Sequence, residues 1–170
     1  MIPLKTLSAD AIPRALAKAE RYRLINQPWA AESICRDILA VAPEQQEALK
    51  TLLLARTDQF RGDAMGHAVE RAREALGRLV GPYERAYYGG MIGERRAMAK
   101  VEQGGPGAGF IAHDLLREAM RYYEEAAAIR PAGNDDALLR WNTCARLLNE
   151  SPLITARRED DQERTPVMNE

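Results

Sequence analysis

The sequence has few of the residue types that build metal and redox sites: it contains two histidines and two cysteines in 170 residues. A four-ligand zinc site needs more such ligands than this. A helical di-iron site needs two Glu-x-x-His motifs, and the chain has none. Cys35 and Cys144 lie far apart in apolar, helix-like segments. We therefore expect no metal and no cofactor, and two buried free thiols in a reducing cytoplasm.

A strong charge and long apolar runs are also missing. The formal net charge is -1, so no overall positive field attracts nucleic acid or an anionic membrane. No segment approaches the ~20 apolar residues that span a bilayer, and the N-terminus lacks the apolar core of a signal peptide. We expect a cytoplasmic protein without nucleic-acid or membrane partners. Twenty arginines against four lysines are typical of a GC-rich genome, and we expect a bacterial source.

A glycine-rich segment, Gly104 to Gly109, leads into a predicted helix, as phosphate-binding loops do. A P-loop needs Lys-Ser or Lys-Thr directly after its glycines and a strand before them. Here Phe110 and Ile111 follow, and the preceding residues look helical. We interpret the segment as a long turn between two helices, with a partner-contacting tip as the alternative. The chain also lacks a G-x-S-x-G elbow, and we expect no enzymatic activity and no catalytic residue.

Helical periodicity, by contrast, is nearly continuous from about residue 11 to 149, and no stretch alternates as a strand would. The fold class predicted is all-α, with about seven antiparallel helices. Proline, glycine and asparagine separate them into the ranges 11–25, 28–41, 45–60, 63–80, 83–102, 111–129 and 135–149. We expect an N-terminal segment at 1–10, a helical domain at 11–150, and a polar, disordered tail at 151–170.

Small residues placed at helix crossings, with prolines closing successive hairpins, give the helical region an internal repeat. The first unit has its small, bulky and closing residues at Ala19, Tyr22, Ala31, Cys35, Ile38 and Pro43. This pattern resembles the tetratricopeptide repeat (TPR) in degenerate form, because the closing prolines 43, 82 and 131 are spaced more widely than the ~34 residues of that family. The resemblance implies three helical hairpins followed by a C-terminal capping helix.

The resemblance also implies that the first helix of each hairpin lines a groove for a protein or peptide partner. On these helices the candidate partner-binding residues are Arg23, Lys50, Tyr87, Glu94 and Arg95. Arginine and tyrosine are enriched at binding hot spots. The alternative interpretation of the segment Gly93–Arg96 is a solvated helix face with local ion pairing. Asparagines of the family's carboxylate-binding clamp are absent, so we do not transfer that clamp.

We therefore expect a non-enzymatic protein-interaction or scaffolding module. One alternative is self-association through the same groove, which gives a homodimer. A second is a small-molecule binder or enzyme with an internal polar pocket, lined by Tyr87, Glu94, Arg95, His113 and Tyr123. In the last helix, Arg140, Trp141 and Asn142 form a further candidate set, although Trp141 in the core is the simpler interpretation.

Overall fold

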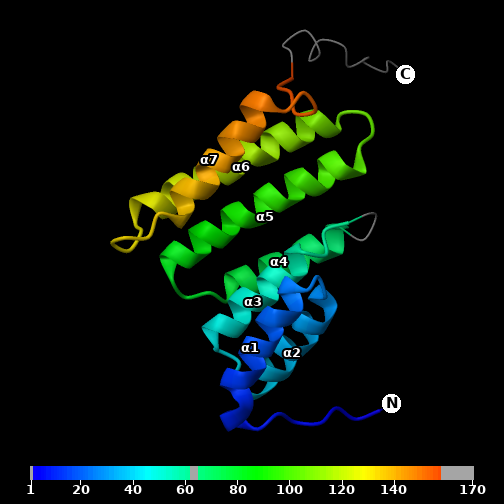
Figure 1. Cartoon of the computed structure of the whole chain (residues 1–170), viewed down its shortest axis with the longest axis vertical. Coiled ribbons are helices and arrows are strands. Elements are labelled where there is room, and N and C mark those ends of the chain that lie inside the picture. The colour runs from blue at the N-terminus through cyan, green and yellow to red at the C-terminus, as the bar shows by residue number, and fades with distance from the viewer. Residues whose placement is uncertain (1, 62–64, 158–170) are drawn as a thin grey trace, which may run out of the picture.

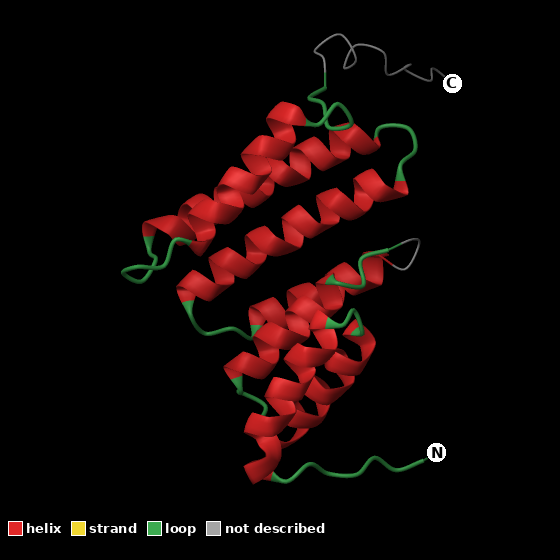
Figure 2. Cartoon of the chain, in the orientation of Figure 1, coloured by secondary structure: helices red, strands yellow, loops and turns green. Residues whose placement is uncertain are grey.

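The computed structural model describes residues 2–61 and 65–157, and within these ranges the chain is helical without any strand (Figure 2). A short 3-10 helix, η1, spans Ala9–Ala11. The seven α-helices of the described residues are α1 (Ile12–Leu24), α2 (Pro28–Val41), α3 (Gln46–Thr57), α4 (Met65–Gly77), α5 (Pro82–Gln103), α6 (Ala108–Ala128) and α7 (Asp136–Glu150). The predicted all-α fold with about seven helices is confirmed.

Helix ends fall where the sequence supplies breaking or capping groups. Asn26, with a φ of 57°, takes the left-handed conformation that ends α1, and Pro28 then opens α2. The side chain of Gln45 caps α3 by accepting hydrogen bonds from the backbone N–H groups of Glu47 at 2.7 Å and Ala48 at 3.2 Å. Before α7, Asn134 Oδ1 accepts the backbone N–H of Asp136 at 3.0 Å.

Three predicted helix ends are off by three residues: α3 ends at Thr57 rather than at 60, α4 ends at Gly77 rather than at 80, and the third error lies at the glycine-rich segment. The sixth helix begins at Ala108 rather than at 111, so the turn between α5 and α6 is only Gly104–Gly107. Gly104, Gly105 and Gly107 have φ values of 69°, 90° and 75°, which side chains other than glycine rarely adopt. The turn is therefore shorter than expected, because Gly109 joins the helix. The predicted start of the fourth helix at 63 lies outside the described residues.

Consecutive helices run antiparallel and stack along the long axis of the molecule, with α1 and α7 toward opposite ends of the stack (Figure 1). Side-chain hydrogen bonds connect α1 to the end of α3, the end of α3 to α5, and α5 to α7. The four odd-numbered helices therefore share one side of the stack. None of the helices in the described ranges is long and apolar enough to cross a membrane.

The buried side chains form two clusters. The first lies between α1, α2, α3 and α4 and includes Ala19, Ala31, Leu49 and Leu53. The second lies between α5, α6 and α7 and includes the residues Ala97, Leu116, Tyr123 and Cys144. Ile92 of α5 belongs to the first cluster, whereas Ala97 of the same helix belongs to the second. Helix α5 thus connects the two cores.

Close approach of α5 and α6 depends on glycine. A Cβ atom at Gly90 would lie 2.7 Å from Cε1 of Tyr123, and one at Gly93 would lie 3.3 Å from Cβ of Ala119. The backbone of α5 therefore comes within contact distance of α6 side chains at these positions. This packing places the phenol of Tyr123 against α5, where the polar site described below is built.

The C-terminal segment packs on the helices at its start. Ile154 is buried in the second cluster, and the carbonyl oxygen of Leu153 lies 2.3 Å from where a Cβ of Gly109 would be. Only glycine at position 109 leaves room for this crossing. The remainder of the predicted tail, 158–170, lies outside the described residues, so its disorder stays a prediction.

Candidate partner-binding surface

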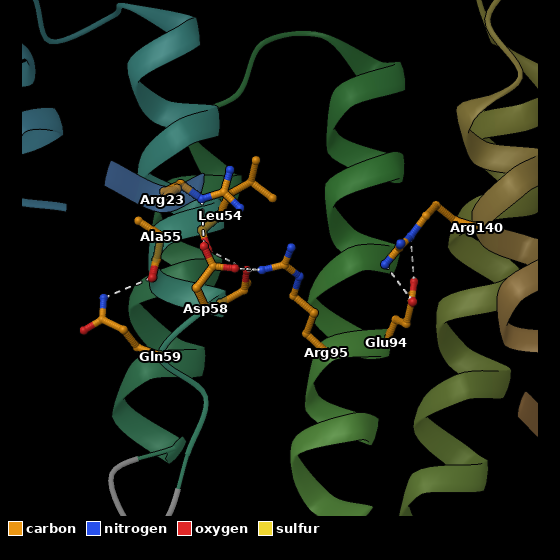
Figure 3. Close-up of polar contacts among 9 residues, drawn as sticks. Arg23, Leu54, Ala55, Asp58, Gln59, Glu94, Arg95 and Arg140 are labelled. Carbon is orange, nitrogen blue, oxygen red and sulfur yellow. Dashed lines mark hydrogen bonds and ion pairs between the residues drawn. The ribbon is translucent and has the colours of Figure 1, made fainter. Parts of the chain in front are cut away.

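Two of the predicted partner-binding residues meet at one carboxylate. Asp58, at the C-terminal end of α3, accepts a hydrogen bond from Arg23 Nε of α1 at 2.7 Å. Its other oxygen is paired with Arg95 Nη1 of α5, which also donates to Thr57 Oγ1 at 2.9 Å (Figure 3). The side chains of Arg23 and Arg95 remain 19% and 27% exposed. Asp58 therefore orients two guanidinium groups from distant parts of the chain while leaving part of each in contact with solvent.

Glu94 lies at the centre of a second polar site, between α5, α6 and α7. Its side chain is only 6% exposed, and both of its oxygens accept hydrogen bonds from Arg140: Oε1 from Nη2 at 2.7 Å and Oε2 from Nε at 3.0 Å. The hydroxyl of Tyr123 donates to Oε2 at 2.7 Å. A bidentate arginine and a phenol thus satisfy the buried carboxylate. The interpretation of this segment as a solvated face is wrong at Glu94.

The electrostatics of this second site keep its protonation fixed near neutral pH. Burial raises the pKa of Tyr123 far above its ordinary value, and the adjacent Glu94 carboxylate raises it further. Burial alone would lower the pKa of Arg140, but the pKa lies above its ordinary value because Glu94 stabilises the charged guanidinium. Tyr123 therefore remains a neutral donor and Arg140 a cation, which makes the site a stable connection between three helices.

Tyr87 joins an aromatic cluster beside these two polar sites. Its ring stacks on Tyr83 with a centroid distance of 5.8 Å and meets Tyr88 edge-on at 5.2 Å. Tyr123 approaches it at 5.9 Å. Burial raises the pKa of Tyr88 to about 12, so this phenol also stays neutral. The cluster adds half-buried aromatic area to the side formed by the odd-numbered helices.

Lys50 lies apart from these contacts. Its Nζ pairs with Glu47 Oε1 at 2.5 Å within α3. Residues four and seven positions apart share a helix face, which places Lys50 on the same stripe of α3 as Leu54 and Thr57. We call the surface formed by Arg23, Lys50, Asp58, Tyr87, Glu94, Arg95 and Arg140 the odd-helix face. Of the predicted residues, the structure places Arg23 and Arg95 in one polar site and the buried Glu94 in another, whereas Tyr87 lies in the aromatic cluster and Lys50 pairs only with Glu47.

The predicted internal pocket does not assemble as a set. Glu94 and Tyr123 do converge, but His113 Nδ1 lies 3.4 Å from Asp114 Oδ1, its neighbour in sequence. Ten residues of α-helix separate His113 from Tyr123, which is about 15 Å along the axis. The other histidine, His67, pairs with Glu70 at 3.8 Å on an exposed face of α4. Among the described residues, no three His, Cys, Asp or Glu side chains gather where they could hold a metal ion.

A third polar site, between α2, α3 and α4, has no counterpart in the sequence-based predictions. Arg56 Nε lies 3.3 Å from Glu32 Oε1, and Gln59 Nε2 donates to Glu32 Oε2 at 2.8 Å. Arg56 also donates to the backbone carbonyl of Arg71. The only signal in the sequence is that Glu32 is three residues before the core residue Cys35. Because these groups are buried and mutually paired, we assign them a structural role.

Trp141 is partly buried against the second cluster, and its indole N–H donates to Glu124 Oε1 at 2.9 Å. The expectation of a satisfied indole N–H is confirmed, but Trp141 lies at the edge of the core rather than inside it. Of the candidate set in the last helix, Arg140 is the member that joins the odd-helix face. Comparison of the chain with protein families, curated proteins and solved structures found no match.

Proposed function

We propose that the protein is a non-enzymatic interaction module, built of degenerate TPR-like hairpins, that binds a segment of a partner protein on the odd-helix face. The observation that carries the proposal is the pair of carboxylates, Asp58 and Glu94, which orient three arginines in two separate polar sites: Arg23 and Arg95 at Asp58, and Arg140 at Glu94 (Figure 3). The repeat interpretation is supported by the complete burial of small residues such as Ala19 and Ala31.

The energetics of such a face favour binding. An exposed arginine loses rotamer freedom when it contacts a partner, at a cost of about 0.5–1.5 kcal/mol for each immobilised side chain. In this protein the ion pairs have already restricted the three guanidinium groups, so binding orders them further at little cost. The neighbouring tyrosines supply rigid aromatic area, and arginine with tyrosine is the composition of interface hot spots. The face carries three arginines and Lys50 against Asp58, Glu94 and Glu47, so it does not select a strongly charged partner.

Affinity capture from the source cell tests this proposal. The bait is the full chain, compared with Arg95→Gln, which removes one cation but leaves Arg23 on Asp58, and with Tyr87→Ala. Arg36→Gln, at an exposed position on α2, is the matched control. We expect both face variants to lose partners that the wild type and the control retain, provided that circular dichroism shows all four to be folded. An unchanged set of partners would refute the assignment of the face.

Self-association is a second candidate because of an exposed apolar edge at the turn between α1 and α2. Leu24, Ile25 and Trp29 are 86%, 57% and 69% exposed. Apolar groups gathered on a surface favour burial against another protein surface. Light scattering coupled to size exclusion tests this candidate, and a monomer at all concentrations would remove it. The cytoplasmic location also stays a prediction, which cell fractionation can test.

A further inference from the structure

A cleft opens between α4 and α6, with α5 as its floor. Its main part has a volume of about 500 Å³, and a smaller extension of about 30 Å³ continues from it along α5. Arg73, Leu76 and Tyr122 line both parts. Small residues of α5, Ala86 in the main part and Gly89 and Gly93 in the extension, form the floor and give the cleft its depth.

The cleft lies on the other side of α5 from the odd-helix face. Residues two positions apart on an α-helix point about 200° away from each other, because each residue turns by 100°. Glu94 belongs to the odd-helix face, and Arg96 lines the extension of the cleft. The residues of α5 that line the cleft are three or four positions apart and so share one face of the helix, as at 82, 85, 86, 89, 93 and 96. The two surfaces are therefore separate.

The extension contains two arginines that no carboxylate neutralises directly. Neither Arg73 nor Arg96 takes part in an ion pair within the described ranges, and Nε of Arg96 is buried there without a hydrogen-bond partner. Burial lowers the pKa of Arg96, and the nearby positive charge of Arg73 lowers it further. Glu118 partly opposes this effect from α6. A carboxylate bound beside the two guanidinium groups would relieve this repulsion.

The main part of the cleft is apolar away from Arg73 and Arg96. Leu76, Pro82 and Ile129 line it, and Ile129 is 52% exposed. Tyr122, 37% exposed, lies where the two parts join. Arg85 adds a third cation and Glu125 a second carboxylate. With three arginines against two glutamates, the cleft complements a ligand that is apolar along most of its length and negatively charged at one end.

We propose that this cleft docks a segment of a partner protein in which an aspartate or glutamate adjoins a bulky apolar residue. The carboxylate accepts hydrogen bonds from Arg96 and Arg73, and the apolar side chain packs on Leu76, Tyr122 and Ile129. A guanidinium binds a carboxylate through two parallel bonds, which fixes the direction of the segment. This site goes beyond the proposed function because it gives the protein a second, chemically selective docking surface behind the first.

Peptide selection tests this proposal directly. A random peptide library displayed on phage is selected against the immobilised full chain, and the most enriched peptide is synthesised with a fluorophore and titrated by anisotropy. We expect enriched sequences in which Asp or Glu lies next to Leu, Ile, Met or Phe. Binding of the synthetic peptide should weaken about tenfold or more in Arg73→Gln and in Arg96→Gln, because each removes a charged hydrogen bond. Arg117→Gln, exposed on α6 outside the cleft, is the matched control and should bind as the wild type does.

The Arg73→Gln variant should fold as the wild type does, because Arg73 is exposed on α4 and its replacement removes no ion pair of the described residues. A loss of binding in this variant can therefore be assigned to the cleft. Amide shifts of ¹⁵N-labelled protein should change along α4, α5 and α6 at the cleft when the peptide is added. The proposal is overturned if no acidic-apolar sequence is enriched, if both arginine variants bind as the control does, or if the shifts map to the odd-helix face. It is also overturned if a chain ending at residue 157 binds the peptide tenfold more tightly, since residues 158–170 would then occupy the cleft.

Discussion

The buried Glu94 carboxylate gives the most quantitative prediction, through replacement of its partner Arg140 by methionine. Methionine keeps most of the apolar stem and removes the guanidinium, so that only the Tyr123 hydroxyl still donates to the carboxylate. Removing one partner of a buried ion pair costs about 3–5 kcal/mol, because the remaining charge is left uncompensated. The side chain of Arg140 is 32% exposed, and water entering there offsets part of the loss. We therefore expect the free energy of unfolding to fall by about 3 kcal/mol, the lower end of that range.

A double-mutant cycle separates this pairing from simple loss of packing. Glu94→Gln keeps the shape of the side chain and removes its charge, and we expect it to cost about 1–2 kcal/mol. The double variant should then cost less than the sum of the two single variants, by about 1.5 kcal/mol, because residues in one hydrogen-bonded network are not independent. Urea unfolding followed by far-ultraviolet circular dichroism measures all four proteins, and the all-helical fold gives a strong signal.

The matched control is Arg146→Met, at an exposed position of the same helix, which should change stability by no more than about 0.5 kcal/mol. Two results would refute the reasoning. One is an Arg140→Met variant no less stable than the control variant. The other is a cycle in which the two single effects add, which would mean that Glu94 and Arg140 do not stabilise each other in solution.

Two further predictions concern the α5–α6 packing and the buried thiols. Gly90→Ala should lower the free energy of unfolding by about 1–3 kcal/mol, because the added methyl group meets the fully buried ring of Tyr123 at 2.7 Å. Gly89→Ala instead meets the partly exposed ring of Tyr122, which can shift, so this variant should be neutral or stabilising by up to about 1 kcal/mol. Equal losses of stability in the two variants would contradict the packing described. Burial raises the pKa of Cys35 and of Cys144 from 9.0 to about 12. The unfolded chain therefore releases the thiol protons at lower pH than the folded chain does. The contribution of the two thiols to the free energy of unfolding is complete below pH 9 and is lost as the pH rises toward 12. Urea unfolding between pH 8 and 10 should show stability falling above pH 9 by up to about 1.4 kcal/mol per pH unit for each thiol, and a Cys144→Ala variant that falls as steeply as the wild type would contradict this origin.

The elements that follow local signals could be predicted from the sequence. Helix α2 has the bounds that Pro28 and Pro43 indicate, because proline fixes its own conformation and restricts the residue before it. The burial of Ala31, Cys35 and Ile38 likewise follows from helical spacing. These signals need only neighbours within a turn or two of helix.

The residues that could not be assigned depend on partners distant in sequence. Nothing in the sequence near Glu94 indicates that Arg140, on another helix, covers it. The charge of Glu94 therefore suggested a position exposed to solvent. Gly109 was expected in a turn for the same reason: its neighbours are glycines, whereas the reason for glycine there is the crossing of Leu153. Tertiary contacts decided both positions, and hydrophobic periodicity does not report such contacts.

Because α5 contributes Ile92 to the first core and Ala97 to the second, the chain cannot be divided cleanly at the loop before Pro82. A fragment ending there would expose the apolar surface of α3 and α4 that Ile92 and Tyr88 cover, and the remaining fragment would expose Ile92 itself. Each piece would carry the missing half of the other's core. Two such fragments, expressed separately, would recombine into a split protein whose assembly is driven by α5.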